Sequence, residues 1–113
     1  MNQENIFGRI LSGEIPCDQV YSDDQCLAFR DIEPQAPVHI LLIPRKVIAG
    51  LDGISNDDEK LLGHLMLVAS KIAKGENLDH WRTVINTGEE SGQTVFHLHI
   101  HILGGRKFKW PPG

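Results

Sequence analysis

The chain has 113 residues and a formal net charge of −4, with 41% of its residues hydrophobic and 23% charged. This is the balance of an ordinary globular protein, and the length suffices for one domain with a single core but not for two. The acidic balance excludes a basic field for holding a nucleic-acid backbone, so we expect no nucleic-acid partner.

The same composition argues against membrane insertion and export. No apolar run approaches the roughly 20 residues of a membrane span, so we expect no membrane partner. The N-terminal stretch "MNQENIFGRI" lacks the charged start and long apolar run of a signal peptide, which makes the cytoplasm the expected compartment. Cys17 and Cys26 are too few for a disulfide framework and match no zinc-finger spacing, so we interpret both as packing residues.

Apolar spacing and turn residues define the first half of the chain. They predict a short amphipathic helix over 6–11, then strands over 19–22, 26–32 and 38–44. Gly13 terminates the helix, and Asp23 and Asp24 form the turn between the first two strands. The prolines of "EPQAP" separate the second strand from the third.

A longer helix and two more strands complete the chain. Ser55 or Asn56 can cap a helix with an acidic first turn, and Gly75 ends it. Its apolar stripe consists of Leu61, Leu65, Val68 and Ile72, flanked by a second apolar row, so more than one side of the helix should be covered. Strands over 82–87 and 95–103 follow. The order predicts an α+β domain with an antiparallel sheet of about five strands.

Three histidines alternate with apolar residues near the C-terminus, in "VFHLHIHILGG". On a strand, His97, His99 and His101 would share one face. The residues between them should face the core: Phe96, Leu98, Ile100 and Ile102. A plain polar face is one interpretation, although such faces normally use Thr, Lys, Glu and Ser. The functional alternatives are a zinc site and nucleophilic or acid–base chemistry by imidazole.

The loop before this strand favours phosphate chemistry. "NTGEESGQT" offers backbone N–H groups, the Thr94 hydroxyl, and the amides of Asn86 and Gln93. Such a loop suits phosphate oxygens better than a cation. By itself this is weak support, since most Gly-containing loops are only turns, but beside three histidines it gains weight.

"HLHIHILGGRKFKWPPG" resembles the signature and tail of the histidine triad (HIT) superfamily, and in particular its Hint branch of purine nucleoside phosphoramidases. Other segments resemble it in the same order: "NIFGRILSGEIPC", "YSDDQCLAFRDIEPQAPVHILLIPRK", "DEKLLGHLMLVASKIA" and "RTVINTGEESGQTVFHLHIHILGGR". The resemblance covers nearly the whole chain and implies one HIT domain over residues 1–113 with a HIT-like fold.

The resemblance implies a catalytic role for four histidines. His99 would attack the α-phosphorus of a nucleotide conjugate and become transiently nucleotidylated. His97, His101 and His39 would orient it and contact phosphate.

Further residues would bind the nucleotide, together with His99 and His101. Asp31 would accept hydrogen bonds from the ribose hydroxyls, which suits a carboxylate. The phosphate-binding loop would comprise Asn86, Gly92, Gln93 and Thr94. The purine pocket would comprise Ile6, Phe7, Ile10, Phe29, Ile32 and Leu41, although composition alone predicts all six as core.

Two positions depart from the family pattern. Thr94 stands where serine is common, and Val47 stands where relatives often have a histidine, which argues against a zinc site that depends on it. His64 and His80 are interpreted as incidental.

The implied activity is hydrolysis of purine nucleoside 5′-monophosphate conjugates, such as AMP or GMP phosphoramidates, with no metal and no cofactor required. A homodimer is expected, with Trp110 near the leaving-group side across the interface. Two alternatives stay open: a zinc-dependent hydrolase using the same histidines, and a nucleotide-binding regulatory module with vestigial activity.

Overall fold

A computed structural model describes residues 5–113 of the chain. Residues 1–4, which begin the stretch expected to lack a leader, lie outside the described residues. In chain order the elements are α1 (Ile6–Leu11), β1 (Gln19–Ser22), β2 (Cys26–Arg30), β3 (Val38–Pro44), the 3₁₀ turns η2 (Leu51–Gly53) and η3 (Asn56–Asp58), α2 (Glu59–Gly75), β4 (Trp81–Val84), the 3₁₀ turn η4 (Glu89–Ser91) and β5 (Ile100–Gly104).

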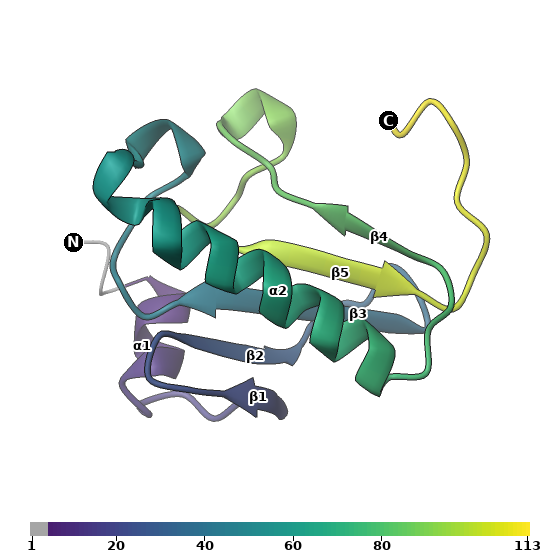
Figure 1. Cartoon of the computed structure of the whole chain (residues 1–113), viewed down its shortest axis with the longest axis horizontal. Coiled ribbons are helices and arrows are strands. Elements are labelled where there is room, and N and C mark those ends of the chain that lie inside the picture. The colour runs from purple at the N-terminus through teal and green to yellow at the C-terminus, as the bar shows by residue number, and fades with distance from the viewer. Residues whose placement is uncertain (1–4) are drawn as a thin grey trace.

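The five strands form one antiparallel sheet in the order β1-β2-β3-β5-β4, and α2 lies across one of its faces (Figure 1). This confirms the predicted α+β architecture and the predicted order of elements. β1 and β3 have their predicted bounds, whereas β2 ends two residues earlier and β4 begins one residue earlier and ends at Val84.

The main core lies between α2 and the sheet. Ile40 and Leu42 of β3 and Ile100 and Ile102 of β5 are buried there against α2. The predicted helical stripe supplies the other half of this core, with Leu65, Val68 and Ile72 buried and Leu61 half-buried. Burial of each such side chain contributes about 1.5–3 kcal/mol, so this layer is what fixes the sheet in place.

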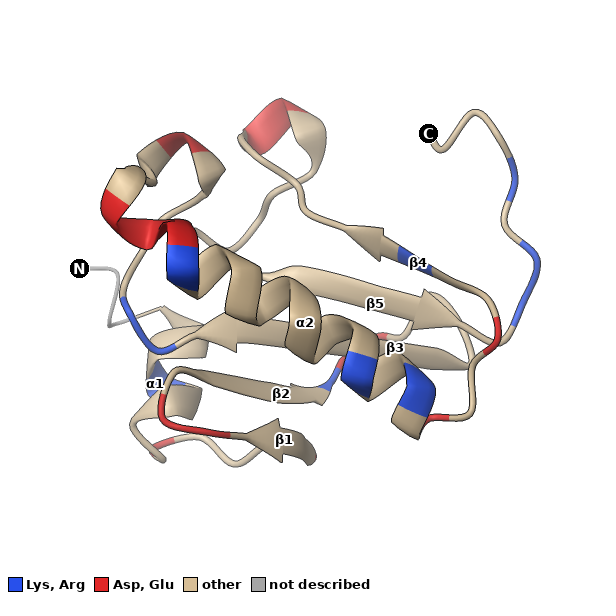
Figure 2. Ribbon diagram, viewed as in Figure 1, with Lys and Arg blue, Asp and Glu red and all other residues tan. Residues whose placement is uncertain are grey.

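The start of α2 follows from its capping residues. Ser55 and Asp58 form a capping box at η3, and the chain becomes α-helical only from Glu59. Acidic residues gather at this end, and Lys71 and Lys74 lie near the other, which matches the helix macrodipole (Figure 2). In residues 5–113, neither α2 nor any other helix is both long and apolar enough to cross a membrane.

The predicted histidine strand is shorter than expected, because β5 begins only at Ile100. β3 and β5 pair as far as Leu42 and Ile100. Continuing this register would oppose Ile43 to His99 and then Leu98 to Pro44, which has no N–H to donate. The Leu98 N–H bonds instead to the Ile48 carbonyl. The prediction that Phe96 faces the core is therefore wrong: its side chain is 44% exposed.

Candidate active site

The sheet face opposite α2 carries the candidate site. β2 and β3 pair Phe29 with Leu41, and β3 and β5 pair Leu41 with His101 and His39 with Leu103. Since directly paired residues point to the same face, these five side chains lie together on the face away from the main core. A second apolar cluster covers the β2–β3 part of that face, and Phe7 of α1 packs into it.

A pocket of about 320 Å³ opens beside this cluster. Ten of the residues predicted for the site line it: Ile6, Phe7, Ile10, Phe29, Asp31, Ile32, Leu41, Thr94, His99 and His101. Ile6 is 44% and Ile32 90% exposed, so the core interpretation from composition is wrong for these two. Sequence reasoning missed seven further lining residues: Ile15, Pro16, Cys17, Asp18, Arg30, Glu33 and Val95. No spacing pattern marks these seven, because they come from loops and strand ends that only the fold brings together.

The His99 ring is held in one tautomer by the backbone. Its Nδ1 lies 2.7 Å from the carbonyl oxygen of His97, and a carbonyl only accepts hydrogen bonds. Nδ1 must therefore carry the hydrogen, which leaves the Nε2 lone pair free in the neutral ring. Burial lowers the pKa of His99, so the imidazole stays neutral near pH 7. Such a ring meets the requirements for a nucleophile.

His39 and His101 form a directed hydrogen-bond chain. The Gln35 N–H donates to His39 Nδ1 at 3.0 Å, so His39 carries its hydrogen on Nε2. That Nε2 lies 2.9 Å from His101 Nδ1, which makes Nδ1 the acceptor and leaves the Nε2–H of His101 as a donor. Burial, and next the neighbouring His99 and His39, lower the pKa of His101 to about 4. His101 is thus a neutral hydrogen-bond donor at the pocket.

Asp31 lies just past the end of β2, on the wall of the same pocket. One carboxylate oxygen accepts from the Glu33 N–H at 2.8 Å, and the other lies 3.4 Å from His39 Nε2. The backbone N–H of Asp31 also bonds to the His39 carbonyl, which ties the acid to β3. The second oxygen keeps lone-pair capacity for hydroxyl donors.

Among residues 5–113, two groups of side chains have donor atoms within 4.8 Å of one another and could hold a metal ion. The first is Asp31, His39 and His101 at the pocket. The second is Asp23, Cys26 and His64, away from it. Burial, helped by Asp23, raises the pKa of Cys26 to about 12, so its thiol stays protonated and is poorly suited to metal binding.

His97 and Gln93 do not line the pocket. The His97 side chain is fully buried, and its Nε2–H donates to the Pro44 carbonyl at 2.9 Å, so it does not reach a phosphate. The Gln93 amide is also engaged: it accepts from the Gly88 N–H and donates to the carbonyls of Ala49 and Val95. We therefore interpret these two side chains as positioning the His99 segment and the loop.

The loop between β4 and the histidines turns sharply at Gly92, whose φ of 101° is a left-handed conformation that favours glycine. A Cβ at Gly92 would lie 3.6 Å from the Asn86 amide, so the two residues lie close together. Asn86 lines a neighbouring groove with His39 and His101 rather than the main pocket. Thr94 alone of the four predicted loop residues lines the pocket itself.

The remaining predicted positions lie elsewhere. Trp110 is 82% exposed on the C-terminal tail and does not line the pocket of its own chain. Cys26 is fully buried, whereas half-buried Cys17 both packs against the second cluster and lines the pocket. His64, interpreted as incidental, contacts Asp23 at 2.7 Å. No sequence pattern marks that contact, because the two residues are 41 positions apart.

Comparisons with known proteins point to one family. The HIT domain family matches residues 12–108. An uncharacterized HIT-like protein of Synechococcus elongatus is 58% identical over 114 residues, covering 100% of both chains. The crystal structure of a HIT family hydrolase from Legionella pneumophila superposes with a TM-score of 0.95 at 46% identity, covering 97% of this chain and 100% of that one. The structure of a histidine triad protein from Clostridium difficile superposes with a TM-score of 0.89 at 42% identity, covering 94% of each chain.

Proposed function

The chain belongs to the HIT domain family, and from this membership we propose that it is a hydrolase of purine nucleoside 5′-monophosphate conjugates, with phosphoramidates as its main substrates. The observation that carries the proposal is the state of His99. Its ring is buried and neutral, and its Nδ1–H is held by a backbone carbonyl, so Nε2 is the free nitrogen beside a pocket that also contains a carboxylate.

The proposed reaction has two displacements at phosphorus. His99 Nε2 attacks, the P–N bond breaks, and its electron pair leaves with the amine, which takes up a proton. Water then displaces His99 and releases the nucleoside monophosphate and a proton. While phosphorus is attached, the His99 ring carries positive charge, and the His97 carbonyl at 2.7 Å from Nδ1 stabilises that charge. Two steps replace one difficult attack by water.

The nucleotide would lie along the sheet face. Phe7 and Phe29, whose rings meet edge to face at 68° with centroids 5.7 Å apart, offer apolar contacts for a purine. Asp31 would accept from the ribose hydroxyls, and the His101 Nε2–H and the Thr94 hydroxyl would donate to phosphate oxygens. The apolar walls accept adenine and guanine alike.

A zinc-dependent hydrolase is the second candidate, because Asp31, His39 and His101 bring three donor atoms within 4.8 Å of one another. In that case zinc would replace the hydrogen bond between the two histidines. A neutral His101 donor, by contrast, needs that hydrogen bond to stay in place.

Turnover of an adenosine 5′-phosphoramidate by the purified protein, with and without EDTA, separates these functions. We expect turnover that EDTA leaves unchanged. Loss of turnover on adding EDTA, with recovery of turnover on adding Zn²⁺, would favour the zinc-dependent hydrolase. Tight AMP binding without turnover would favour a regulatory module.

A further inference from the structure

The sheet face that carries the histidines continues onto β4. β5 pairs with β4 through His101 and Val84 and through Leu103 and Arg82, so Arg82 lies in the same cross-strand row as His39, with Leu103 between them. The proposed nucleoside pocket lies on the other side of the histidines, over β2 and β3. Substrate bound there would place its phosphorus over the histidines and direct the leaving group toward Arg82.

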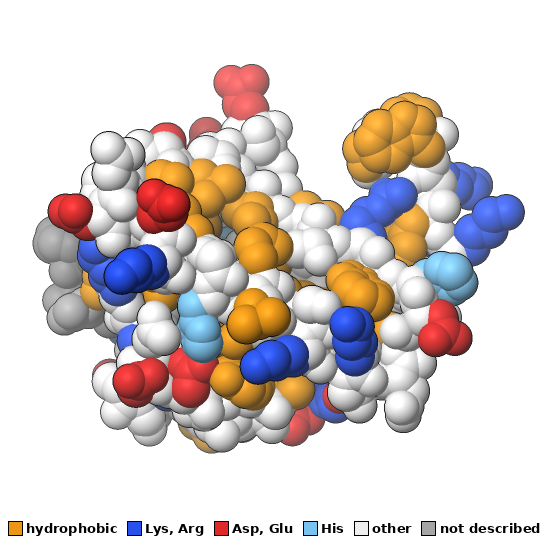
Figure 3. Space-filling model, viewed as in Figure 1, with side chains coloured by type: hydrophobic (Ala, Val, Ile, Leu, Met, Phe, Trp, Pro, Cys, Tyr) orange, Lys and Arg blue, Asp and Glu red, His pale blue; other side chains and the backbone are white. Residues whose placement is uncertain are grey.

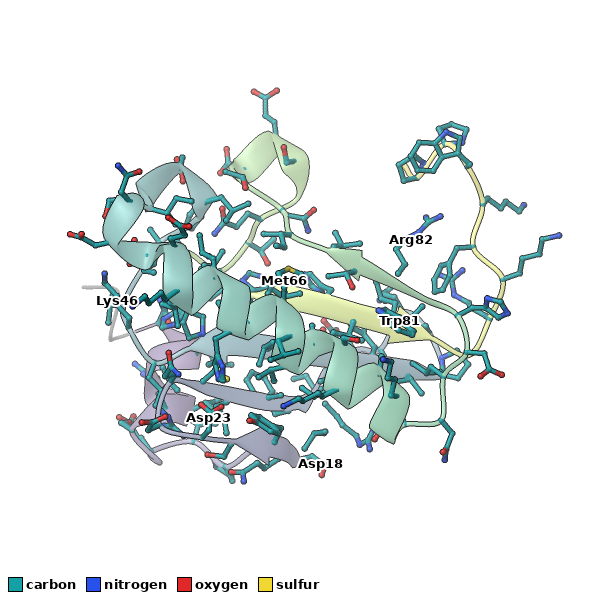
Figure 4. The ribbon with its side chains drawn as sticks, in the orientation of Figure 1. Asp18, Asp23, Lys46, Met66, Trp81 and Arg82 are labelled. Carbon is teal, nitrogen blue, oxygen red and sulfur yellow. The ribbon has the colours of Figure 1, made fainter. Side chains whose placement is uncertain are left out.

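A groove of about 270 Å³ occupies this position. His101 lines both the groove and the nucleoside pocket, so the two hollows adjoin at this histidine. His39, Arg82, Arg106 and Phe108 also line the groove. Figure 4 shows Arg82 extending from the edge strand toward the C-terminal tail.

Phe108 holds two guanidinium groups beside the groove. The guanidinium carbon of Arg82 lies 5.1 Å from the ring centroid of Phe108, and that of Arg106 lies 4.3 Å from it. Backbone carbonyls fix both groups further: Arg82 donates to Lys109, and Arg106 donates to Gln35 and Lys107. These contacts preorganise the two cations at the end of the proposed substrate path.

Neither cation is neutralised within the described chain. Among residues 5–113, no ion pair within 4.0 Å joins Arg82 or Arg106 to a carboxylate. A guanidinium has five N–H donors, and the recorded hydrogen bonds use one from Arg82 and two from Arg106. Donors and charge therefore remain for an anion.

We propose that this groove is the leaving-group subsite and that it selects conjugates whose leaving amine carries an anionic group, a carboxylate or a phosphate. The proposal rests on the function proposed above and names its substrate class. Paired Arg side chains suit both anions because their planar N–H groups match two oxygens at once.

Matched leaving groups test the proposal. Adenosine 5′-phosphoramidates of one amino acid are prepared with a free carboxylate or a carboxamide, and a second pair carries aminoethyl phosphate or ethanolamine. The kcat/KM ratio of charged to neutral conjugate is measured for the wild type, Arg82→Gln, Arg106→Gln and Arg82→Lys. Lys71→Gln, an exposed position on α2 at the opposite face of the sheet, makes the same charge change and serves as control.

We expect the wild type to favour at least one charged conjugate over its neutral partner by about 10-fold, and each glutamine variant to reduce that ratio by about 5-fold. Arg82→Lys should keep more of the charged-to-neutral ratio than Arg82→Gln does, and Lys71→Gln should leave the ratio at the wild-type value. Added salt should lower the wild-type ratio. The pair with the larger ratio identifies carboxylate or phosphate. Equal rates for charged and neutral conjugates in the wild type, or equal ratios in Arg82→Gln and Lys71→Gln, would overturn the proposal. No turnover of any conjugate would overturn the proposed function itself.

Discussion

At the scale of single residues, the candidate nucleophile depends on backbone groups. The His99 tautomer is set by the carbonyl of His97, and the Pro44 carbonyl in turn holds the His97 ring. A carbonyl cannot take the proton from Nδ1, so the hydrogen stays on that nitrogen throughout a reaction at Nε2. The alternation of histidines predicts that three rings gather, but it does not reveal this division of roles.

Asp31 supports a prediction for nucleotide binding. Asp31→Asn replaces a charged acceptor by an amide, so we expect AMP binding to weaken by about 1–3 kcal/mol. Binding of 2′-deoxy-AMP should weaken less, because one hydroxyl donor is already missing. Titration calorimetry with both nucleotides measures the difference, and Glu33→Gln, an exposed carboxylate on the same pocket, is the matched control. Equal losses for the two sugars would show that Asp31 acts only on the local structure.

Residue types in the sequence predict most of the pocket, but not what each side chain does. His97 and Gln93 are polar residues in a motif, yet both are buried and their side chains hydrogen-bond to backbone groups. The Nδ1 of His97 is the one nitrogen of these two side chains without a hydrogen-bond partner among residues 5–113. Ile6 and Ile32 are apolar, yet both are exposed at the pocket edge. Burial depends on neighbours that are distant in the chain, so composition predicts the wrong surroundings for Ile6 and Ile32, and residue type alone does not show that His97 and Gln93 are buried.

At the scale of elements, periodicity predicts the sheet and α2 well, because one apolar face of each must be buried. It fails at the start of β5. Alternation continues through residues 95–103, but ladder hydrogen bonding requires a donor on the partner strand, and Pro44 offers none. The residue at which β5 begins therefore depends on which residues of β3 lie opposite it, and this register cannot be read from the sequence of β5 alone.

The turn between β1 and β2 is joined to α2 through Asp23. Its carboxylate accepts from the Tyr21 hydroxyl at 2.8 Å and from His64 at 2.7 Å, and it also accepts the N–H groups of Gln25 and Cys26. Burial alone would raise the pKa of Asp23, but these hydrogen bonds hold that pKa well below its usual range. The charged form is therefore the one that stabilises the fold.

Asp23→Asn should lower the free energy of unfolding by about 1–3 kcal/mol near pH 7. Because the folded-state pKa is depressed, the wild-type contribution is present above about pH 4 and is lost as the pH falls below that value. Urea unfolding near pH 7 and at about pH 3.5 measures both effects. Asp24→Asn, the exposed neighbour, is the control and should change little. An equal effect of the two substitutions at both pH values would contradict this account.

At the scale of the whole molecule, an apolar surface remains uncovered. Met66 and Leu67 of α2 are 44% and 54% exposed, and Met66 also lines an apolar hollow between α2 and Ile85. Figure 3 shows hydrophobic side chains following α2 toward β4, which is an edge strand of the sheet. A surface of this kind is typical of protein interfaces, and we propose that it joins two copies of the chain in a two-fold dimer.

Sedimentation velocity should give about twice the 12.6 kDa of one chain. Met66→Glu should dissociate the dimer, whereas Lys74→Glu, exposed near the end of the same helix, should not.

Deleting residues 110–113 removes exposed Trp110 and should leave the dimer intact while changing kcat/KM unequally among leaving groups. A monomeric intact protein, or one common factor for all leaving groups, would refute this arrangement.

The most direct test of the whole account is to locate the covalent intermediate. Rapid quenching with a slow adenosine 5′-phosphoramidate, followed by digestion and fragmentation mass spectrometry, should place one adenylyl group on His99. His99→Ala should form no adduct and show no turnover. An adduct on His97 or His101, or His99→Ala turning over at the wild-type rate, would contradict the account.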